Sequence, residues 1–274
     1  MRQHPVSVES EVAFLKAEWR ERKDIPHIYS RQSRLDNTKR YLVTIHNARP
    51  RHTAGDLDLD DSGFILVEHE SKVTDFRDKQ LVADVYFPEM RDLILAETGA
   101  AAAFPVEFYQ VRSADPAHFF DAYSLYMHCD FSPNSWTKLA RHFIRAAGTE
   151  AEYSDEEWDF ALYNLWRPVG GPVEQDPLAL IDASTVARSD IVEYSPVKDR
   201  DDGRAAVPLF NPAQILYYVP HMQLNEVLVF KQMDSRSGRA MVCPHTSFHD
   251  PTAKSDSRAR ESIDIRMVCV FPKR

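Results

Sequence analysis

Short segments rich in β-branched and aromatic residues recur along the chain, separated by turn residues such as proline, glycine and aspartate. Several of them alternate apolar and polar side chains with a period of two, as a β-strand with one buried face does. The pattern predicts strands over residues 39–45, 64–69, 81–87, 104–112, 159–168, 215–219, 226–233, 240–248 and 261–271. Many short strands joined by turns favour a sandwich or a barrel.

Apolar residues follow helical spacing in three other places. The first lies near the N-terminus, where Ser10 is a candidate helix cap. The apolar positions of this predicted helix are Val12, Phe14, Leu15 and Trp19. Two more helices are predicted over 88–103 and 134–147, and the charged residues 198–204 predict an exposed loop or hairpin tip. The predicted class is therefore mainly β with flanking helices.

The composition disfavours some classes of binding partner for this chain. With 42 acidic and 33 basic side chains the formal net charge is -9, which disfavours nucleic acid and anionic membranes as partners. No apolar run reaches membrane-spanning length, and the N-terminus lacks the apolar segment of a signal peptide. Cys129, Cys243 and Cys269 each lie in apolar sequence, as reduced core cysteines do. We therefore expect a cytoplasmic protein that binds neither nucleic acid nor membrane.

The most informative short motif is His128-Cys129-Asp130, which apolar and aromatic residues flank. Alternate residues of a strand point to the same side, so His128 and Asp130 are expected to project together. An imidazole and a carboxylate are two of the three ligands of the facial triad that holds non-haem Fe(II). Because a His-x-Asp pair is common by chance, the interpretation depends on a third ligand.

His245 is the candidate third ligand. It ends a short apolar segment after Pro244, and ligands of a jelly roll come from strands that are distant in sequence. His221 and His249 are the competing histidines, in a predicted turn and beyond the strand respectively. A histidine at a strand end also occurs as a purely structural residue, so position alone does not decide.

A basic residue that could bind a cosubstrate follows His245. Arg260 and Ser262 are predicted to face the same side at the head of the last strand. A guanidinium with a hydroxyl two residues on suits the distal carboxylate of a dicarboxylic acid such as 2-oxoglutarate, whose 2-oxo-acid end can chelate Fe(II). Arg258 and Arg266 are alternatives for the same role.

Other polar and aromatic residues are candidates for the substrate pocket. Arg167 stands in an otherwise apolar segment, where a guanidinium is costly unless it meets an anion. It is either a binding residue or half of a structural ion pair, for which Asp182 is an available partner. The substrate candidates are Tyr126, Asn164, Trp166, Arg167 and Lys231.

Taken together, several stretches resemble the hydroxylase/desaturase family of secondary metabolism, which includes the cephamycin methoxylation protein and endoperoxide-forming iron oxygenases. These stretches are residues 128–132, 164–168, 177–182, 226–235, 244–251 and 260–266. The resemblance implies a double-stranded β-helix (a cupin-like jelly roll) and dependence on Fe(II) and 2-oxoglutarate. It also implies His128, Asp130 and His245 as ligands and Arg260 as the cosubstrate anchor.

On this interpretation the chain is an oxygenase that uses O2 to hydroxylate, desaturate or cyclise a small-molecule intermediate of natural-product biosynthesis. We expect one domain over residues 1–274, in which residues 1–70 brace a catalytic core over residues 105–271. A homodimer is compatible with the sequence. Two other hypotheses are a metal-dependent hydrolase with the same three ligands, and a non-catalytic accessory subunit of a methyltransferase. The hydrolase would need no cosubstrate and hence no Arg260, and a pure scaffold would have no need of the three ligands.

Overall fold

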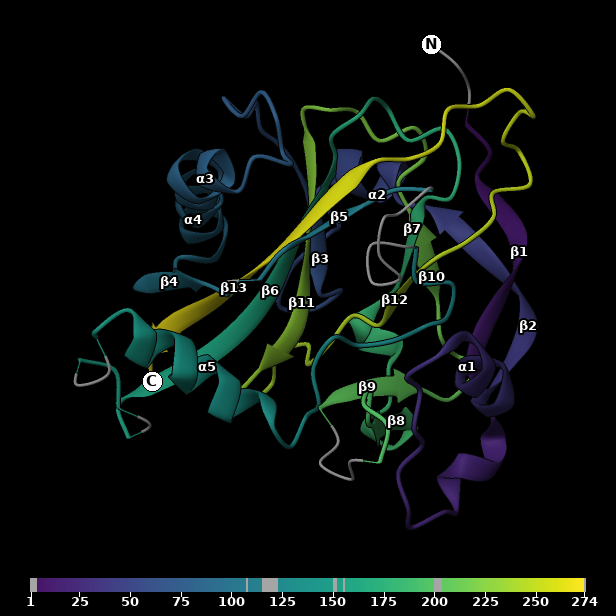
Figure 1. Cartoon of the computed structure of the whole chain (residues 1–274), viewed down its shortest axis with the longest axis horizontal. Helices are drawn as coiled ribbons and strands as arrows, with labels where there is room; N and C mark the ends of the chain where they lie inside the picture. The colour runs from purple at the N-terminus through teal and green to yellow at the C-terminus, as the bar shows by residue number, and fades with distance from the viewer. Residues whose placement is uncertain are drawn as a thin grey trace.

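The computed structural model describes residues 4–106, 108–114, 123–149, 152–154, 156–199 and 204–273. Two large β-sheets lie side by side, with the helix α4 (Phe87–Thr98) on the far side of one of them (Figure 1). All strand pairs in this part of the chain are antiparallel except β2 with β10. The architecture is mainly β, as expected from the sequence.

The five-stranded sheet has the order β1 (Ser7–Leu15), β2 (Thr38–Asn47), β10 (Leu216–Tyr218), β7 (Leu178–Ile181) and β12 (His245–Ser247). The six-stranded sheet has the order β3 (Phe64–Glu68), β11 (Glu226–Asp234), β6 (Trp158–Pro168), β13 (Ser262–Pro272) and β4 (Ala102–Pro105), and β5 (Gln110–Arg112) also pairs with β13. A small hairpin consists of β8 (Ile191–Tyr194) and β9 (Ala205–Pro208).

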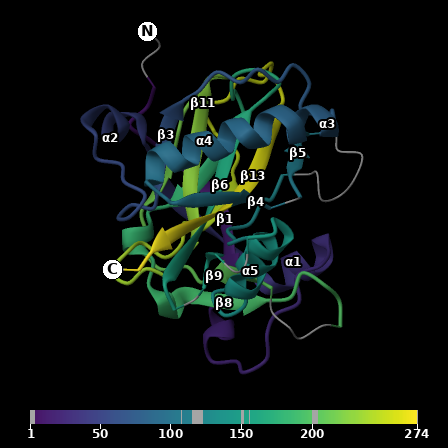
Figure 2. The same ribbon diagram turned by 90° about the vertical axis from the view of Figure 1, so that its left-hand side faces the viewer.

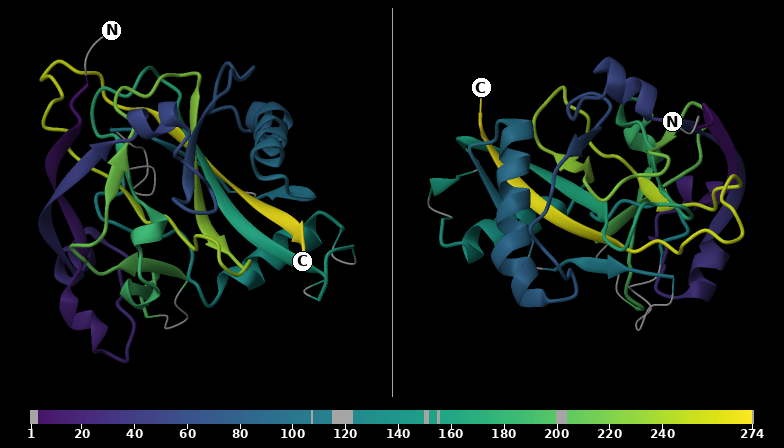
Figure 3. Two further views of the ribbon diagram at one scale, coloured as in Figure 1. Left: turned by 180° about the vertical axis from the view of Figure 1, so that it is seen from behind. Right: turned by 90° about the horizontal axis from the view of Figure 1, so that it is seen from above.

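Helices flank the six-stranded sheet, and α4 crosses its outer face (Figure 2). The other α-helices are α1 (Arg31–Asn37), α2 (Arg49–Ala54), α3 (Lys79–Leu81) and α5 (Trp136–Ala146). A π-helical turn spans Val82–Tyr86, and 3-10 turns span Ala17–Arg20, Ala183–Thr185 and Arg188–Asp190. Seen from above, α4 and β1 lie on opposite sides of the molecule (Figure 3).

Strand β6 shows how the sheet separates its two faces. Tyr163 and Leu165 are fully buried in the core that also contains residues of α4. Alternate residues point the other way, and Trp166 packs in the core that includes residues of β7 from the other sheet. Because both faces of β6 are covered, nine of its eleven residues are buried, and polar side chains on the inner face must find partners.

The predicted N-terminal helix is wrong, because Ser7–Leu15 forms β1 and pairs with β2 along its whole length. Helical spacing holds for four apolar residues, but Val8, Ser10 and Val12 are also buried in alternation, with exposed residues between them. Pairing with β2 supplies the backbone hydrogen bonds of the segment, and the alternating burial places one face of the strand in the core. The segment braces the sheet as a strand.

The strand predicted over residues 81–87 is also wrong, because helical turns run from Lys79 to Thr98. The Asp78 carboxylate caps this segment by accepting hydrogen bonds from the backbone N–H groups of Gln80 and Leu81. Pro88 lies in the first turn of α4, where its missing N–H is tolerated. The capping signal at Asp78 thus outweighs the β-branched content of the residues that follow.

The remaining predicted elements are confirmed with shifted ends, and residues 104–112 divide into β4 and β5. Of the predicted loop at 198–204, residues 200–203 lie outside the described residues, and the flanking strands β8 and β9 form the hairpin. In the described parts of the chain, no helix combines the length and the apolar character that crossing a membrane requires.

Candidate metal centre

Three side chains converge between the two sheets: His128, Asp130 and His245. Their potential ligand atoms all lie within 4.8 Å of one another. Asp130 Oδ1 is 3.5 Å from His128 Nε2 and 3.7 Å from His245 Nε2. Both histidines are buried, and the two rings lie 4.4 Å apart between centroids. Two imidazole nitrogens and one carboxylate oxygen facing a common point are a donor set suited to Fe(II).

The backbone brings these residues together. His128 and His245 form an isolated antiparallel bridge, in which each backbone N–H donates to the other residue's carbonyl at 3.0 and 2.9 Å. The next residue, Cys129, bridges to Ala206 of β9 and points its side chain into the core. Because alternate residues face the same way, His128 and Asp130 both turn toward β13 and the cavity.

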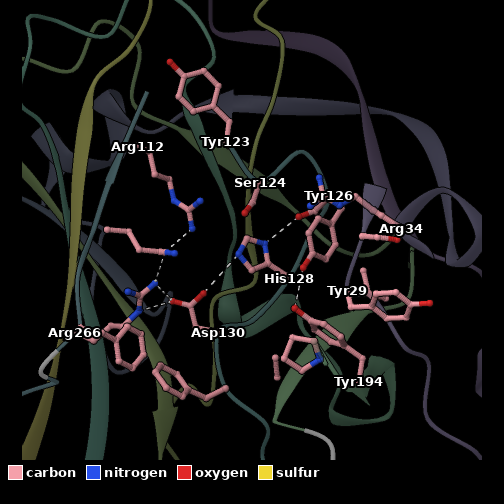
Figure 4. A pocket seen from close by; sticks show the side chains of 17 residues that line it. Tyr29, Arg34, Arg112, Tyr123, Ser124, Tyr126, His128, Asp130, Tyr194 and Arg266 are labelled. Atoms are coloured by element: carbon pink, nitrogen blue, oxygen red, sulfur yellow. Dashed lines mark hydrogen bonds and ion pairs between the residues drawn. The ribbon is translucent and has the colours of Figure 1, made fainter. Parts of the chain in front are cut away.

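Each histidine is oriented by a contact at its second nitrogen. His128 Nδ1 lies 3.0 Å from the Tyr126 carbonyl oxygen, to which a protonated Nδ1 donates (Figure 4). His245 Nδ1 lies 3.4 Å from Nε2 of Gln232, an amide nitrogen that can only donate, so this contact positions the ring without holding a proton on Nδ1. At His128, a proton on Nδ1 leaves Nε2 as the electron-pair donor, which is how ligating histidines are held. In both cases Nε2 is the atom that faces Asp130.

Asp130 is held so that only one carboxylate oxygen is available to a metal. Its Oδ2 accepts hydrogen bonds from Arg266 Nε at 2.8 Å and from Asn164 Nδ2 at 2.7 Å, and Arg266 Nη2 is also 2.7 Å away. Its backbone N–H donates to Gln232 Oε1 at 2.9 Å. Arg266 also binds Asp264 at 2.8 Å and thus lies between two carboxylates. Oδ1 faces the histidines.

Burial and charge tune the protonation of the three groups. Desolvation lowers the pKa of His128 to about 4 and that of His245 to about 3, so both rings are neutral at pH 7. Burial would raise the pKa of Asp130, but the charge on Arg266 and the hydrogen bond from Asn164 hold it below its usual range. Neutral imidazoles and an ionised carboxylate are the forms that bind a cation.

A small pocket next to His245 contains Arg260. Its guanidinium stacks at 4.2 Å over the Tyr123 ring and at 5.3 Å over the Trp166 ring, and it donates to the Asp176 carbonyl oxygen. Burial lowers the pKa of Arg260 to about 10, which leaves it cationic at pH 7. No carboxylate among the described residues forms an ion pair with it. Ser247 also lines this pocket.

The other residues considered for the cosubstrate lie elsewhere. Arg258 is exposed, with its guanidinium beside Gly171, and Arg266 is committed to Asp130 and Asp264. Ser262 is fully buried at the start of β13, and its hydroxyl has no hydrogen-bond partner among the described residues. In the backbone pairing of β13 with β5, Ser262 lies opposite Arg112.

A larger cavity of about 300 Å³ opens beside His128 and Asp130 (Figure 4). Tyr126, a predicted substrate residue, lines it, and its hydroxyl lies 2.8 Å from that of Tyr194. The described lining comprises Ile28, Tyr29, Ser30, Arg34, Phe108, Gln110, Arg112, Tyr123, Ser124, Tyr126, His128, Asp130, Phe131, Tyr194, Pro196, Ala205 and Arg266. Six of these residues are phenylalanine or tyrosine, and most of the others are polar or charged.

Two predicted substrate residues lie on the opposite face of the six-stranded sheet. Lys231 is fully buried and pairs with Asp60 at 2.9 Å and Asp234 at 2.7 Å. Arg167 donates to the Leu224 carbonyl oxygen and lies 3.3 Å from His69. Neither lines the cavity or the small pocket.

The ion-pair partner suggested for Arg167 is wrong, because the Asp182 carboxylate binds Arg51 at 2.7 Å. Asn164 and Trp166, by contrast, face the site: Asn164 bonds Asp130 and Trp166 lines the small pocket. The competing histidines His221 and His249 are not part of the metal cluster.

Sequence reasoning missed four residues of the site: Arg34, Arg112, Gln232 and Asp264. Asp264 and Arg266 follow Ser262 at alternate positions of one strand, so the period of two could have found Asp264. Gln232 reaches the site because the pairing register of β11 with β6 shifts between Lys231 and Met233, and sequence gives no local sign of that irregularity. Arg34 lies on a short helix far from the motifs.

Comparisons with known proteins agree with this geometry. A family model described as "Oxidoreductase/YMDC permease-like domain" matches residues 13–270. The chain is 31% identical over 206 residues to "Hydroxylase/desaturase asaB" of Aspergillus flavus, covering 67% of this chain and 89% of that protein. It is 28% identical over 228 residues to "Alpha-ketoglutarate-dependent dioxygenase phiK" of a fungal species, covering 79% and 80%.

A solved structure is also similar. The chain superposes on the "iron and alpha-ketoglutarate-dependent endoperoxidase NvfI with different conformation" with a TM-score of 0.85 at 23% identity, covering 99% of this chain and 100% of that one. The likeness supports the fold: two curled sheets with flanking helices, over the whole length of the chain.

Proposed function

Because the chain belongs to the hydroxylase/desaturase family of Fe(II)/2-oxoglutarate-dependent oxygenases, we propose that His128, Asp130 and His245 hold its iron. The protein is an enzyme of secondary metabolism, an oxidoreductase whose cofactors are Fe(II) and 2-oxoglutarate. The observation that carries the ligand assignment is the convergence of two Nε2 atoms and Asp130 Oδ1 on one point. The second oxygen of Asp130 is taken by Arg266 and Asn164, so the carboxylate binds through a single atom.

Iron with 2-oxoglutarate supplies the oxidising power: O2 is consumed, and the cosubstrate is converted to succinate and carbon dioxide. The chain's own contribution is to position the reactants and to exclude water. Arg260 binds the distal carboxylate of 2-oxoglutarate in the small pocket beside His245. Its burial, its charge and the absence of a paired carboxylate among the described residues support this role. Ser262, whose buried hydroxyl has no hydrogen-bond partner among the described residues, is the second residue assigned to the cosubstrate.

The larger cavity is the substrate site, with Tyr126 in its wall. The substrate is a small molecule that is hydroxylated, desaturated or cyclised, according to which of its hydrogens lies nearest the iron. As part of the same proposal, the two sheets form a double-stranded β-helix in a single cytoplasmic domain, residues 1–274, which is compatible with a homodimer.

The test is an anaerobic titration of the metal-free protein with Fe(II) and then 2-oxoglutarate, followed by the visible metal-to-ligand charge-transfer band. The band is expected in the wild type and lost in His245→Ala. His221→Ala and His249→Ala, which change the two competing histidines, are matched controls and should keep it. Iron binding without a band on addition of 2-oxoglutarate would favour the metal-dependent hydrolase or the accessory-subunit hypothesis instead.

A further inference from the structure

Arg260 reaches the small pocket from a part of the chain that is neither strand nor helix. The connection from β12 to β13 consists of turns and irregular backbone, and Arg260 stands two residues before β13 begins at Ser262. Its side chain is buried, and its hydrogen-bond acceptor among the described residues is a backbone carbonyl, that of Asp176, rather than a carboxylate. Because a buried cation is costly without favourable contacts, uncharged neighbours must hold this guanidinium in place.

Tyr123 makes two contacts with Arg260. Its hydroxyl donates to the Arg260 carbonyl oxygen, and its ring centroid lies 4.2 Å from the guanidinium carbon. The Trp166 ring is more distant, at 5.3 Å. The electron-rich face of an aromatic ring attracts a cation, and more strongly where the cation is desolvated. One side chain thus fixes both the main chain and the charged end of Arg260.

Tyr123 also separates the small pocket from the larger cavity. It lines the cavity but not the pocket, whereas Arg260 lines the pocket but not the cavity. Since the two side chains are in contact, the Tyr123 ring stands between the guanidinium and the cavity. The next residue, Ser124, accepts a hydrogen bond at its carbonyl oxygen from the Ser247 N–H at 2.8 Å. The segment that carries Tyr123 is therefore attached to β12, the strand of His245.

The guanidinium that Tyr123 holds keeps donors for an anion. Nη1 of Arg260 donates to the Asp176 carbonyl oxygen, but Nε is buried without a hydrogen-bond partner among the described residues. A carboxylate binds best to parallel N–H groups of a guanidinium, so the orientation of the side chain decides how well the anion is bound. Fixing that orientation before the ligand arrives lowers the entropic cost of binding.

We propose that Tyr123 is a positioning residue for the cosubstrate: it holds Arg260 so that the guanidinium meets the distal carboxylate of 2-oxoglutarate. The inference rests on the proposed function and adds a residue to the same site. Tyr123 thereby sets the preference for a 2-oxo acid with two carboxylates over one with a single carboxylate. It acts through Arg260, so a 2-oxo acid without a distal carboxylate gains nothing from it.

The test compares 2-oxoglutarate with 2-oxopentanoate, in which a methyl group replaces the distal carboxylate. The full chain, loaded anaerobically with Fe(II), is titrated with each acid, and the charge-transfer band gives the two dissociation constants. Their ratio measures the preference for the dicarboxylate. Tyr123→Leu should reduce this ratio by about tenfold, through weaker binding of 2-oxoglutarate, while the dissociation constants of Fe(II) and 2-oxopentanoate stay within about twofold of wild type. Tyr123→Phe, which keeps the ring, should retain most of the preference.

Tyr109→Leu is the matched control. Tyr109 is also partly buried, but its ring packs on Phe87 of α4 and lines neither the cavity nor the small pocket. This variant should keep the wild-type preference. Arg260→Met should abolish the preference, and adding Tyr123→Leu to it should change the ratio no further, because both changes remove the same interaction.

The proposal is overturned if Tyr123→Leu keeps the wild-type ratio or if it weakens both 2-oxo acids alike, as a purely structural residue would. It is also overturned if Tyr123→Leu lowers the ratio further in the Arg260→Met background. A wild type that forms no band, or an Arg260→Met variant that keeps the full preference, contradicts the proposed function itself, and the role of Tyr123 with it.

Discussion

At the scale of single residues, Arg266 decides how Asp130 is presented. We expect Arg266→Met to weaken Fe(II) binding by about 10–100-fold, because the carboxylate loses the partner that orients it. Loss of this buried cation also leaves Asp264 uncompensated, so the free energy of unfolding should fall by about 3–5 kcal/mol. Metal titration and urea unfolding measure the two effects.

Two further variants separate the effect of Arg266 on the orientation of Asp130 from its effect on the free energy of unfolding. Adding Asp264→Asn to Arg266→Met removes the uncompensated charge, so part of the stability should return while the Fe(II) affinity stays low. Arg258→Met, in the same loop-and-strand segment but exposed, should change neither quantity. Equal Fe(II) affinity in Arg266→Met and wild type would show that Asp130 is oriented without Arg266.

The two histidines make the free energy of unfolding of the metal-free protein depend on pH. The pKa values are about 4 for His128 and about 3 for His245, below the usual 6.5. Between these values, the histidines bind protons in the unfolded chain but not in the folded protein. Stability present at pH 7 is therefore lost as the pH falls from about 6.5 toward 4. Burial raises the pKa of Asp264 to about 6, which acts in the opposite sense between pH 6 and 4.

Comparison with His245→Asn isolates one histidine, because Asp264 is common to both proteins. Between pH 6 and 4, unfolding free energies from urea titrations should fall more steeply in wild type than in the variant, by about 1 kcal/mol per pH unit. Parallel curves would mean that His245 is protonated in the folded protein.

At the scale of elements, Gly63 controls how the turn before β3 meets the strand that carries His245. It has φ +80°, and an added Cβ would lie 2.6 Å from Cys243 Sγ and 2.8 Å from Ala183 Cβ. Gly238 has a similar φ of +74° but open space around it. Gly63→Ala should therefore lower the free energy of unfolding by roughly 1–3 kcal/mol more than Gly238→Ala. Equal melting temperatures for the two variants would contradict this packing argument.

Strand positions were predictable from sequence wherever burial alternates, whereas two segments were assigned the wrong element. Ser7–Leu15 contains both a helical and an alternating pattern, and only its pairing with β2 decides between them. Residues 81–87 have strand-like composition, but the Asp78 cap and α4 continue through them as helical turns. Local composition is a weak guide where a neighbouring element supplies the partner.

The residues of the site also divide into those that the sequence predicts and those that it does not. The convergence of His128 and Asp130 was predictable because an alternating pair is visible in sequence, whereas the cosubstrate role of Arg260 stays a prediction. Gln232 depends on a register shift, and Arg34 reaches the cavity only through the way the N-terminal segment folds against the sheets. Contacts between residues about 100 positions apart, such as Asn164 with Asp264, follow from strand order, which no local pattern contains.

At the scale of the whole molecule, the metal centre joins the two sheets. His245 belongs to β12 of one sheet, whereas Asp130 is held by side chains of β6, β11 and β13 in the other. A bound ion therefore opposes separation of the sheets. With Fe(II) at about 100 times its dissociation constant, amides that exchange only through this separation should exchange up to about 100-fold more slowly.

Anaerobic hydrogen exchange with mass spectrometry tests this coupling. Slower exchange is expected at His128, Asp130 and His245, whose backbone N–H groups lie at the junction, and not at the β1–β2 edge. His245→Ala should lose the effect in both sheets together, because the ion no longer has a ligand from β12. Protection that persists in β6 and β13 of this variant would mean that Asp130 and the six-stranded sheet hold the ion without the other sheet.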